Sequence, residues 1–288
     1  MANSKYTERP NGVSKTMKKT WITMTILALL AMSLFSCDIE FDPASYIDRT
    51  RILGIRVDPI EAAPGEEITF SALVVDKGGD VVDYPVFFSV VGSDLRDADP
   101  GNDLPSDMET SFLKPAGTES ITWTIPAQDQ LESLFGTPQE SGYLLTLAVG
   151  AFTNAEGNGD PLVGFKSFVI SERSEEERRQ NPVLEEIRVY AGGQRVNPDG
   201  QGMHNVAGTR VTLRAVPQDP EGVVSYHWFA TEEEFSANLD DTEVLQAGSK
   251  GLYTAVCVMR QSYFFENDYG GRTQIAGMDW KVISIDFQ

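Results

Sequence analysis

Five aspartates lie within one predicted loop, residues 92–110, together with prolines, glycine and asparagine. Calcium ions prefer several oxygen ligands, which clustered carboxylates, asparagine and backbone carbonyls can supply. The spacing lacks the closing glutamate of an EF-hand loop, so a solvated acidic surface loop is the alternative interpretation. The candidate calcium ligands are Asp94, Asp97, Asp99, Asp103 and Asp107. A second, shorter group with the same two interpretations comprises Asn154, Glu156, Asn158 and Asp160. No other cofactor is predicted.

The histidines and the cysteine, residue types that often carry catalysis, lie outside known catalytic motifs. His204 lies in a Gly-rich turn, and neither it nor His227 belongs to a Gly-x-Ser-x-Gly, His-Glu-x-x-His or zinc-spaced pattern. Cys257 lies in the middle of a predicted strand, which is typical of a buried apolar side chain rather than of a reactive thiol. We therefore predict no catalytic residue and no enzymatic activity. A carboxylate-based hydrolase is the remaining enzymatic alternative.

An aromatic segment, QSYFFENDYGG at residues 261–271, lies between the last two predicted strands. Aromatic side chains supply contact area at low entropic cost, and small polar residues adapt to a partner. The segment is therefore a candidate recognition loop. In the alternative interpretation, Phe264 or Phe265 extends the preceding strand and packs inside. The candidate recognition residues are Tyr263, Phe264, Phe265, Asn267, Asp268 and Tyr269.

Short strands must position these segments. Apolar and polar residues alternate in stretches rich in β-branched and aromatic residues, separated by turn signals such as Ala63-Pro64-Gly65-Glu66, which is typical of a β-sandwich or barrel. Residues 127–135 are predicted to form a short helix. The predicted strands are 51–57, 68–75, 85–91, 121–125, 142–151, 162–170, 184–189, 223–229, 251–260 and 280–287.

A charged segment divides the strands into two sets. Residues 171–182, SERSEEERRQNP, are polar up to the final proline, and form either a short exposed helix or a solvated linker. After it, LEEIRV at residues 184–189 echoes ILGIRV at residues 52–57, and residues 206–213 echo residues 62–69. Two copies of one all-β unit explain this repetition. The predicted divisions are a signal (1–36), an acidic tether (37–49), a first sandwich (50–171), a charged linker (172–182) and a second sandwich (183–288).

Tyr226-His227-Trp228 in one strand, and Gly251-x-Tyr253-Thr254 opening another, resemble bacterial Ig-like and PKD-like domains. Trp228 is the candidate core aromatic of its strand, and His227 is expected on the opposite face of the sheet. The chain departs from the PKD pattern after Trp228, and the predicted second sandwich holds no other cysteine that could pair with Cys257. The resemblance implies two tandem Ig-like antiparallel β-sandwich domains. It also implies a spacer, adhesion or docking role, and places the aromatic segment where such domains carry recognition loops.

The N-terminal stretch MKKTWITMTILALLAMSLFSCD, residues 17–38, has two lysines, a short apolar run and a small residue before Cys37. It resembles a bacterial lipoprotein signal. The resemblance implies cleavage before Cys37, palmitate-type acylation of that cysteine, and a lipid anchor in the inner or outer membrane. The sixteen residues before it are polar, which suggests that translation begins at Met17.

The formal net charge of −20 limits the class of partner. Nucleic acid is excluded because its phosphates would be repelled, and only the lipid on Cys37 would hold so acidic a chain on a membrane. We expect a non-enzymatic envelope protein that binds or scaffolds another envelope protein or a glycan. The alternative is a structural spacer or a subunit of an envelope assembly that uses its sheet faces.

Overall fold

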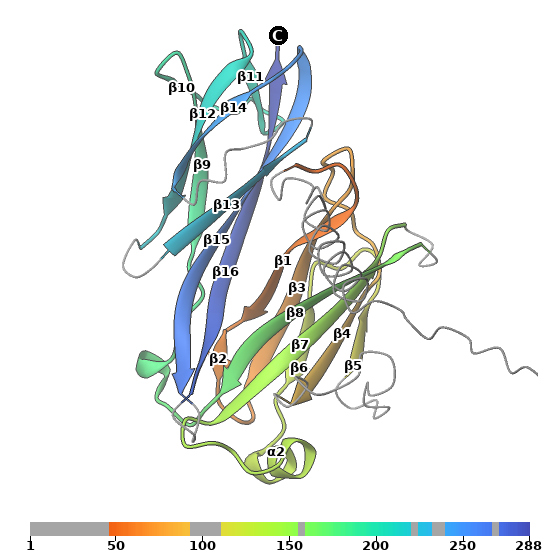
Figure 1. Cartoon of the computed structure of the whole chain (residues 1–288), viewed down its shortest axis with the longest axis vertical. Helices are drawn as coiled ribbons and strands as arrows, with labels where there is room; N and C mark the ends of the chain where they lie inside the picture. The colour runs from red at the N-terminus through yellow and green to blue at the C-terminus, as the bar shows by residue number, and fades with distance from the viewer. Residues whose placement is uncertain (1–45, 93–110, 155–158, 220–223, 232–239, 267–270) are drawn as a thin grey trace, which may run out of the picture. The chain divides into compact units, whose positions relative to one another are not determined.

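The computed structural model describes residues 46–92, 111–154, 159–219, 224–231, 240–266 and 271–288. The part of the chain from residue 44 onward forms one compact unit, built almost entirely of antiparallel sheet (Figure 1). The predicted all-β class is confirmed. The predicted helix is also present, as α2 (Gln128–Phe135). Among the described residues, none of the helices has the length and apolar character needed to cross a bilayer.

Two sheets make up the first sandwich. The first sheet has the order β1-β3-β6, with β1 (Arg51–Asp58), β3 (Glu67–Val75) and β6 (Ile121–Thr124). The second sheet has the order β2-β8-β7-β4-β5, with β2 (Glu61–Ala62), β8 (Pro161–Ile170), β7 (Tyr143–Phe152), β4 (Val86–Gly92) and β5 (Ser111–Lys114).

The second sandwich repeats this construction. One sheet has the order β10-β9-β12-β14, with β10 (Gln194–Val196), β9 (Leu184–Ala191), β12 (Arg210–Pro217) and β14 (Thr242–Gln246). The other has the order β11-β16-β15-β13, with β11 (Met203–Val206), β16 (Arg272–Phe287), β15 (Gly251–Glu266) and β13 (Val224–Ala230).

The strand order is Ig-like in both sandwiches. In the first, β1-β3-β6 faces β8-β7-β4, and in the second, β9-β12-β14 faces β16-β15-β13. A short strand also pairs in parallel with the last strand of each, β2 with β8 and β11 with β16. Assigned in chain order, these sheets correspond to the A-B-E and G-F-C sheets of immunoglobulin domains. The repeat seen in the sequence is therefore a repeat of topology.

Each sandwich has an apolar core of its own. In the first, Phe70 packs near Phe88, Trp123 and Phe168, with ring centroids 5.9 to 6.1 Å apart. In the second, Trp228 on β13 is buried, and its indole N–H donates to the Asp240 carbonyl at 3.1 Å. The expectation that Trp228 is a core aromatic is confirmed. Because each core is closed by its own two sheets, each sandwich has the burial that a small β domain requires.

Cys257 shares its buried surroundings with Tyr253 and Ala255, as the alternation of the strand predicts. Tyr253 lies near the start of β15, and its hydroxyl donates to the Ser249 carbonyl at 3.2 Å. This is the position and bond of the tyrosine corner of immunoglobulin-type domains. The thiol of Cys257 is fully buried, and burial raises its pKa above the ordinary range.

Outer faces of the two sandwiches pack on each other. Leu53, Leu73 and Val75 of the first sandwich form one buried cluster with Val256 and Val258 of the second. The turn between β3 and β4 contributes to the same junction. A Cβ on Gly79 would lie 2.4 Å from Cγ2 of Thr231 and 2.7 Å from Cβ of Thr254. Only glycine fits this approach, so the contact depends on one residue type.

The hairpin of β15 and β16 is longer than the sequence indicates, since the strands pair without a break from Gly251 with Phe287 to Glu266 with Arg272. Its distal part, residues 260–266 and 272–279, is called the arm below. Phe265 and Ile275 of the arm pack with Val169 of β8 in a separate buried cluster. The predicted end of the strand at residue 260 is therefore wrong, because the strand continues where it gains apolar contacts with the first sandwich.

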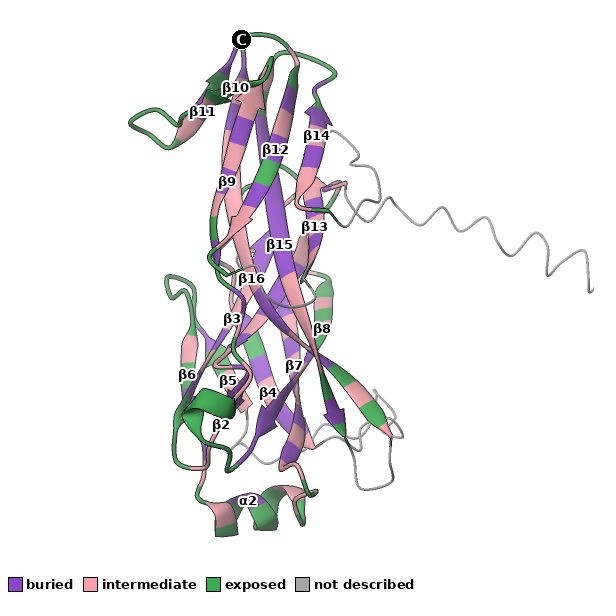
Figure 2. Cartoon of the chain, turned by 90° about the vertical axis from the view of Figure 1, so that its left-hand side faces the viewer, coloured by how far each residue is buried: buried purple, intermediate pink, exposed green. Residues whose placement is uncertain are grey.

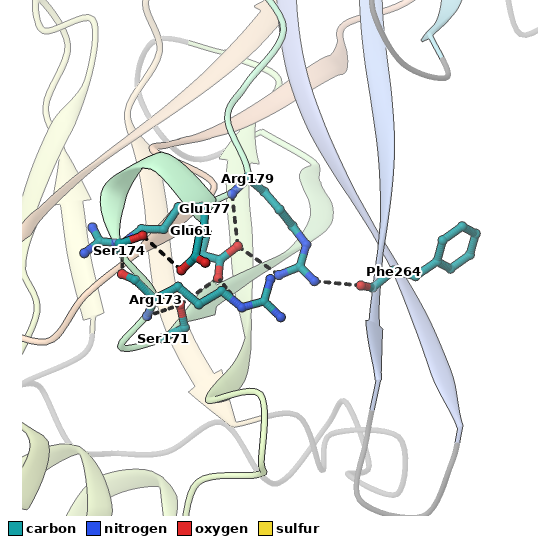
Figure 3. A network of polar contacts seen from close by, with 8 residues as sticks. Glu61, Ser171, Arg173, Ser174, Glu177, Arg179 and Phe264 are labelled. Carbon is teal, nitrogen blue, oxygen red and sulfur yellow. Dashed lines mark hydrogen bonds and ion pairs between the residues drawn. The ribbon is translucent and has the colours of Figure 1, made fainter.

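The charged segment after β8 folds back onto the first sandwich around Glu61, which is fully buried (Figure 3). Oε1 of Glu61 accepts a bond from the Ser171 hydroxyl at 2.6 Å, and Oε2 accepts one from the Arg179 guanidinium at 2.8 Å. Arg179 also donates to the Phe264 carbonyl of the arm at 2.7 Å. One turn of 3-10 helix, Glu175–Glu177, is exposed. The solvated-linker interpretation is wrong for Arg179, which pairs with the buried Glu61.

Candidate functional site

Most of the site residues predicted from the sequence lie outside the described residues. These are Cys37, Asp94, Asp97, Asp99, Asp103, Asp107, Asn267, Asp268 and Tyr269. The lipid anchor and the main calcium group therefore stay predictions. Within the described ranges, no three side chains of histidine, cysteine, aspartate or glutamate come together in an arrangement that could hold a metal ion.

The aromatic residues that the structure does describe lie in strand β15 and not in a loop. Phe265 is fully buried against Val169 and Ile275, so it is wrong as a surface recognition residue. Tyr263 is partly buried, and its hydroxyl donates to the Gln180 carbonyl at 2.5 Å. Phe264 is exposed. Successive side chains of a strand point to opposite faces of the sheet, so the strand separates these aromatic residues. The local sequence pattern had indicated that they form a single loop.

The two histidines have structural surroundings. His204 lies in strand β11 rather than in the predicted turn, is buried, and its Nδ1 is 3.0 Å from the Val196 carbonyl oxygen. His227 alternates with the core residue Trp228, as predicted. Burial lowers the pKa of His227, and the nearby Arg260 guanidinium lowers it further. Both imidazoles are thus held by strand packing.

A cluster of exposed apolar side chains lies on the outer face of the five-stranded sheet. Phe87 is 49% exposed, Leu113 54%, Val163 65% and Phe165 64%. We call these four residues the apolar face. They come from β4, β5 and β8, three strands that are far apart in sequence. The first half of β8 shows alternating exposed and half-buried residues in Figure 2.

Strand register places the four side chains together. Leu113 is the cross-strand partner of Phe87, Phe87 is the partner of Gly150, and Gly150 is the partner of Val163. Two residues along β8, Phe165 pairs with Ala148. Directly paired residues on one face have neighbouring Cβ atoms, and residues i and i+2 of a strand share a face. Glycine and alanine on the central strand keep the surface between the large side chains flat.

Exposing four large apolar side chains to water is unfavourable, which indicates that the apolar face has a function. Single exposed apolar residues are ordinary, whereas contiguous exposed apolar patches mark interaction sites. Sequence reasoning missed the apolar face, although β8, with the sequence PLVGFKSFVI, carried a signal. Its apolar residues occupy both faces of the strand, and a strand with one solvated face alternates with polar residues instead.

The geometry thus defines an all-β protein with two Ig-like sandwiches and one exposed apolar sheet face. No known protein family and no curated protein matches the chain.

Similar solved structures do exist. The D0–D1 domain of intimin has 14% identity, a TM-score of 0.22, and coverage of 82% of this chain and 99% of that one. Fibronectin(III)-like modules of Clostridium thermocellum CbhA have 12% identity and a TM-score of 0.24, over 82% and 94% of the two chains. Latent PorU from Porphyromonas gingivalis has 13% identity and a TM-score of 0.23, over 83% of this chain and 24% of that one. Likenesses this low carry no argument, so the Ig-like assignment rests on strand order.

Proposed function

We propose that this protein is a lipid-anchored scaffold of the bacterial cell envelope that docks another envelope protein on its apolar face. The single observation that carries the docking role is the continuous row of Leu113, Phe87, Gly150 and Val163, with Phe165 beside it. Four large side chains exposed on a flat, regular sheet offer a preformed surface, which reduces the ordering cost of association.

The anchor in this proposal is the lipid on Cys37. The residues around it resemble a lipoprotein signal, and two or three acyl chains give stable attachment because each buried methylene contributes about 0.8 kcal/mol. Removal of residues 1–36 takes away five basic residues and one acidic residue, and the resulting net charge of −24 keeps the folded part away from an anionic bilayer surface. The lipid then supplies attachment, and the apolar face stays available for protein.

Charge also favours a different protein over a second copy of this chain. Two copies without the signal would each bring a net charge of −24, and such repulsion keeps a protein monomeric. Asp160, an exposed acid, directly precedes β8 and so lies at the border of the apolar face. The partner that fits presents an apolar patch bordered by lysine or arginine, which would combine apolar burial with electrostatic steering.

Substitution of the apolar face tests this function. The tagged protein is cross-linked in intact cells, the captured partner is identified and purified, and its affinity is measured for wild type and variants. Phe87→Ser and Phe165→Ser should each weaken binding about tenfold or more, because loss of a central aromatic contact typically costs more than about 1 kcal/mol. Leu252→Ser is the matched control, since Leu252 is also 64% exposed but lies on the second sandwich.

Two results would overturn the docking role. Variants of the apolar face that bind the partner as well as wild type would remove the face from the interface. A concentration-dependent dimer of the purified protein that Phe165→Ser abolishes would show that the face pairs with itself. Sedimentation of wild type and Phe165→Ser separates that outcome from binding of a different protein.

A further inference from the structure

A polar cleft of about 750 Å³ lies beside the Glu61 network. Its walls come from the connection between α2 and β7, from the segment after β8, and from the tip of the arm. Ser171 and Arg173, labelled in Figure 3, belong to one wall. The volume falls in the range of small-molecule sites, but the lining is mainly polar, which disfavours an apolar ligand.

Two residues that line this cleft each carry a buried polar atom without a hydrogen-bond partner among the described residues. The two atoms are the hydroxyl oxygen of Tyr143 and Oε1 of Gln139. Tyr143 is only 5% exposed, and burial raises the pKa of its phenol, so the hydroxyl stays neutral and able to donate. Leaving a buried polar atom unpaired is unfavourable, and native structures nearly always satisfy such atoms.

The backbone holds these two residues in place. Gln139 and Gly142 exchange backbone hydrogen bonds of 3.0 and 2.9 Å across a tight turn. Gly142 has a positive φ of 105°, and a Cβ there would lie 2.2 Å from the Ile170 carbonyl oxygen. The turn is therefore fixed against the end of β8. The unpaired atoms belong to a preformed wall and not to a loose loop.

The charges around the cleft favour a neutral ligand. Arg272 pairs with Glu266 at 2.7 Å, and Arg173 lies 3.8 Å from Glu61. Both lining arginines thus have carboxylate neighbours, and the glutamates Glu140 and Glu172 also line the cleft. An anion would meet these carboxylates, and a cation would meet the arginines. A ligand without net charge avoids both penalties.

We propose that this cleft binds a neutral saccharide. A hydroxyl group both donates and accepts, so the hydroxyls of a sugar can donate to Oε1 of Gln139 and accept from the Tyr143 hydroxyl. The apolar rings of Pro64 and Pro138 line the cleft and offer contact to the carbon face of a sugar. One or two sugar rings match the volume. The site is separate from the apolar face, so it is independent of the proposed docking function.

Saturation-transfer NMR measures the binding of glucose, N-acetylglucosamine and maltose to the full folded chain. At least one of these sugars should give a saturable signal. Tyr143→Phe should weaken that binding about tenfold, equivalent to loss of one hydrogen bond. In the absence of sugar the same variant should unfold at the wild-type temperature or above it, because the substitution removes an unpaired buried hydroxyl. Tyr190→Phe, in the second sandwich, is the control and should bind as wild type does.

Two results would overturn the proposal. Absence of a saturable signal for all three sugars would show that the cleft holds water only. Equal binding by Tyr143→Phe and wild type would place the sugar elsewhere on the protein. Gln139→Leu, which removes the second unpaired atom, separates a change in binding from a change in folding if Tyr143→Phe proves unstable.

Discussion

Glu61 and Arg179 form an ion pair between residues 118 positions apart, with Oε2 of the fully buried carboxylate 2.8 Å from the guanidinium. The same carboxylate accepts a bond from the Arg179 backbone N–H at 3.1 Å. Since Arg179 also bonds the Phe264 carbonyl, one residue ties the first sandwich, the segment after it and the arm together. The segment between the sandwiches is thus part of the packed structure.

Removal of Glu61 should be costly. In Glu61→Ala the Arg179 guanidinium and the Ser171 hydroxyl lose their shared acceptor, and breaking a buried ion pair by removing one partner costs about 3–5 kcal/mol. Urea unfolding measures the change. Glu67→Ala is the control, because Glu67 is an exposed glutamate in the next strand and should change stability by less than about 0.5 kcal/mol. Equal effects of the two substitutions would contradict a structural role for the network.

The loss of stability caused by crowding Gly79 against the second sandwich can be separated from the loss caused by backbone strain. Gly79 and Gly65 share a φ of +84°, but a Cβ on Gly65 would meet nothing within 4 Å. Gly65→Ala should therefore cost only the left-handed backbone penalty of about 1–2 kcal/mol. Gly79→Ala should cost clearly more, since the methyl group overlaps Thr231 and Thr254. Thermal unfolding of both variants gives the comparison. Similar losses would show that the turn and the threonines are not packed together.

Lys166 makes the stability depend on pH. Burial, reinforced by the nearby Arg260, lowers its pKa from 10.5 to about 7, and its Nζ donates to the Ala276 carbonyl of the arm. Between these two values the unfolded chain binds the proton and the folded chain does not, so this residue makes stability rise with pH. Below pH 7 both states are protonated and the cost of burying the charge is complete.

Replacement of Lys166 should reduce this pH dependence. We expect the free energy of unfolding of wild type to rise between pH 7 and 9 by up to about 1.4 kcal/mol per pH unit from this residue. Lys166→Met should lose that contribution to the slope. Lys77→Met, at an exposed lysine, should keep the wild-type slope. Chemical denaturation at a series of pH values provides the test, and an unchanged slope in Lys166→Met would show that the amine stays charged in the folded state.

The local sequence pattern was sufficient to predict several strands and the repeat. Alternation located β1, β3, β7 and β8 to within one residue at their ends, and the echo of LEEIRV with ILGIRV located the same strand in both sandwiches. Trp228 was identified as a core aromatic for the same reason. These features depend on neighbours in sequence, which is the information that a single chain carries.

Features that depend on distant residues could not be predicted. The strand before the arm was predicted to end at residue 260, and its extension through Phe264 or Phe265 was only the alternative, because the packing of the arm depends on Val169 of another sandwich. No role was predicted for Glu61, since only the return of Arg179 explains its burial. The apolar face required the register of Phe87 with Leu113 and Gly150, which no local pattern specifies. The proposed docking surface is therefore a product of topology.

Site-specific photo-cross-linking in intact cells tests the docking role most directly. A photoreactive phenylalanine analogue replaces Phe165 on the apolar face or, as the control, Leu252 on the second sandwich. We expect one discrete adduct with a different envelope protein from position 165, its loss when Phe87→Ser is added, and no such adduct from position 252. Adducts of equal yield from both positions, or none from position 165, would rule out docking on the apolar face.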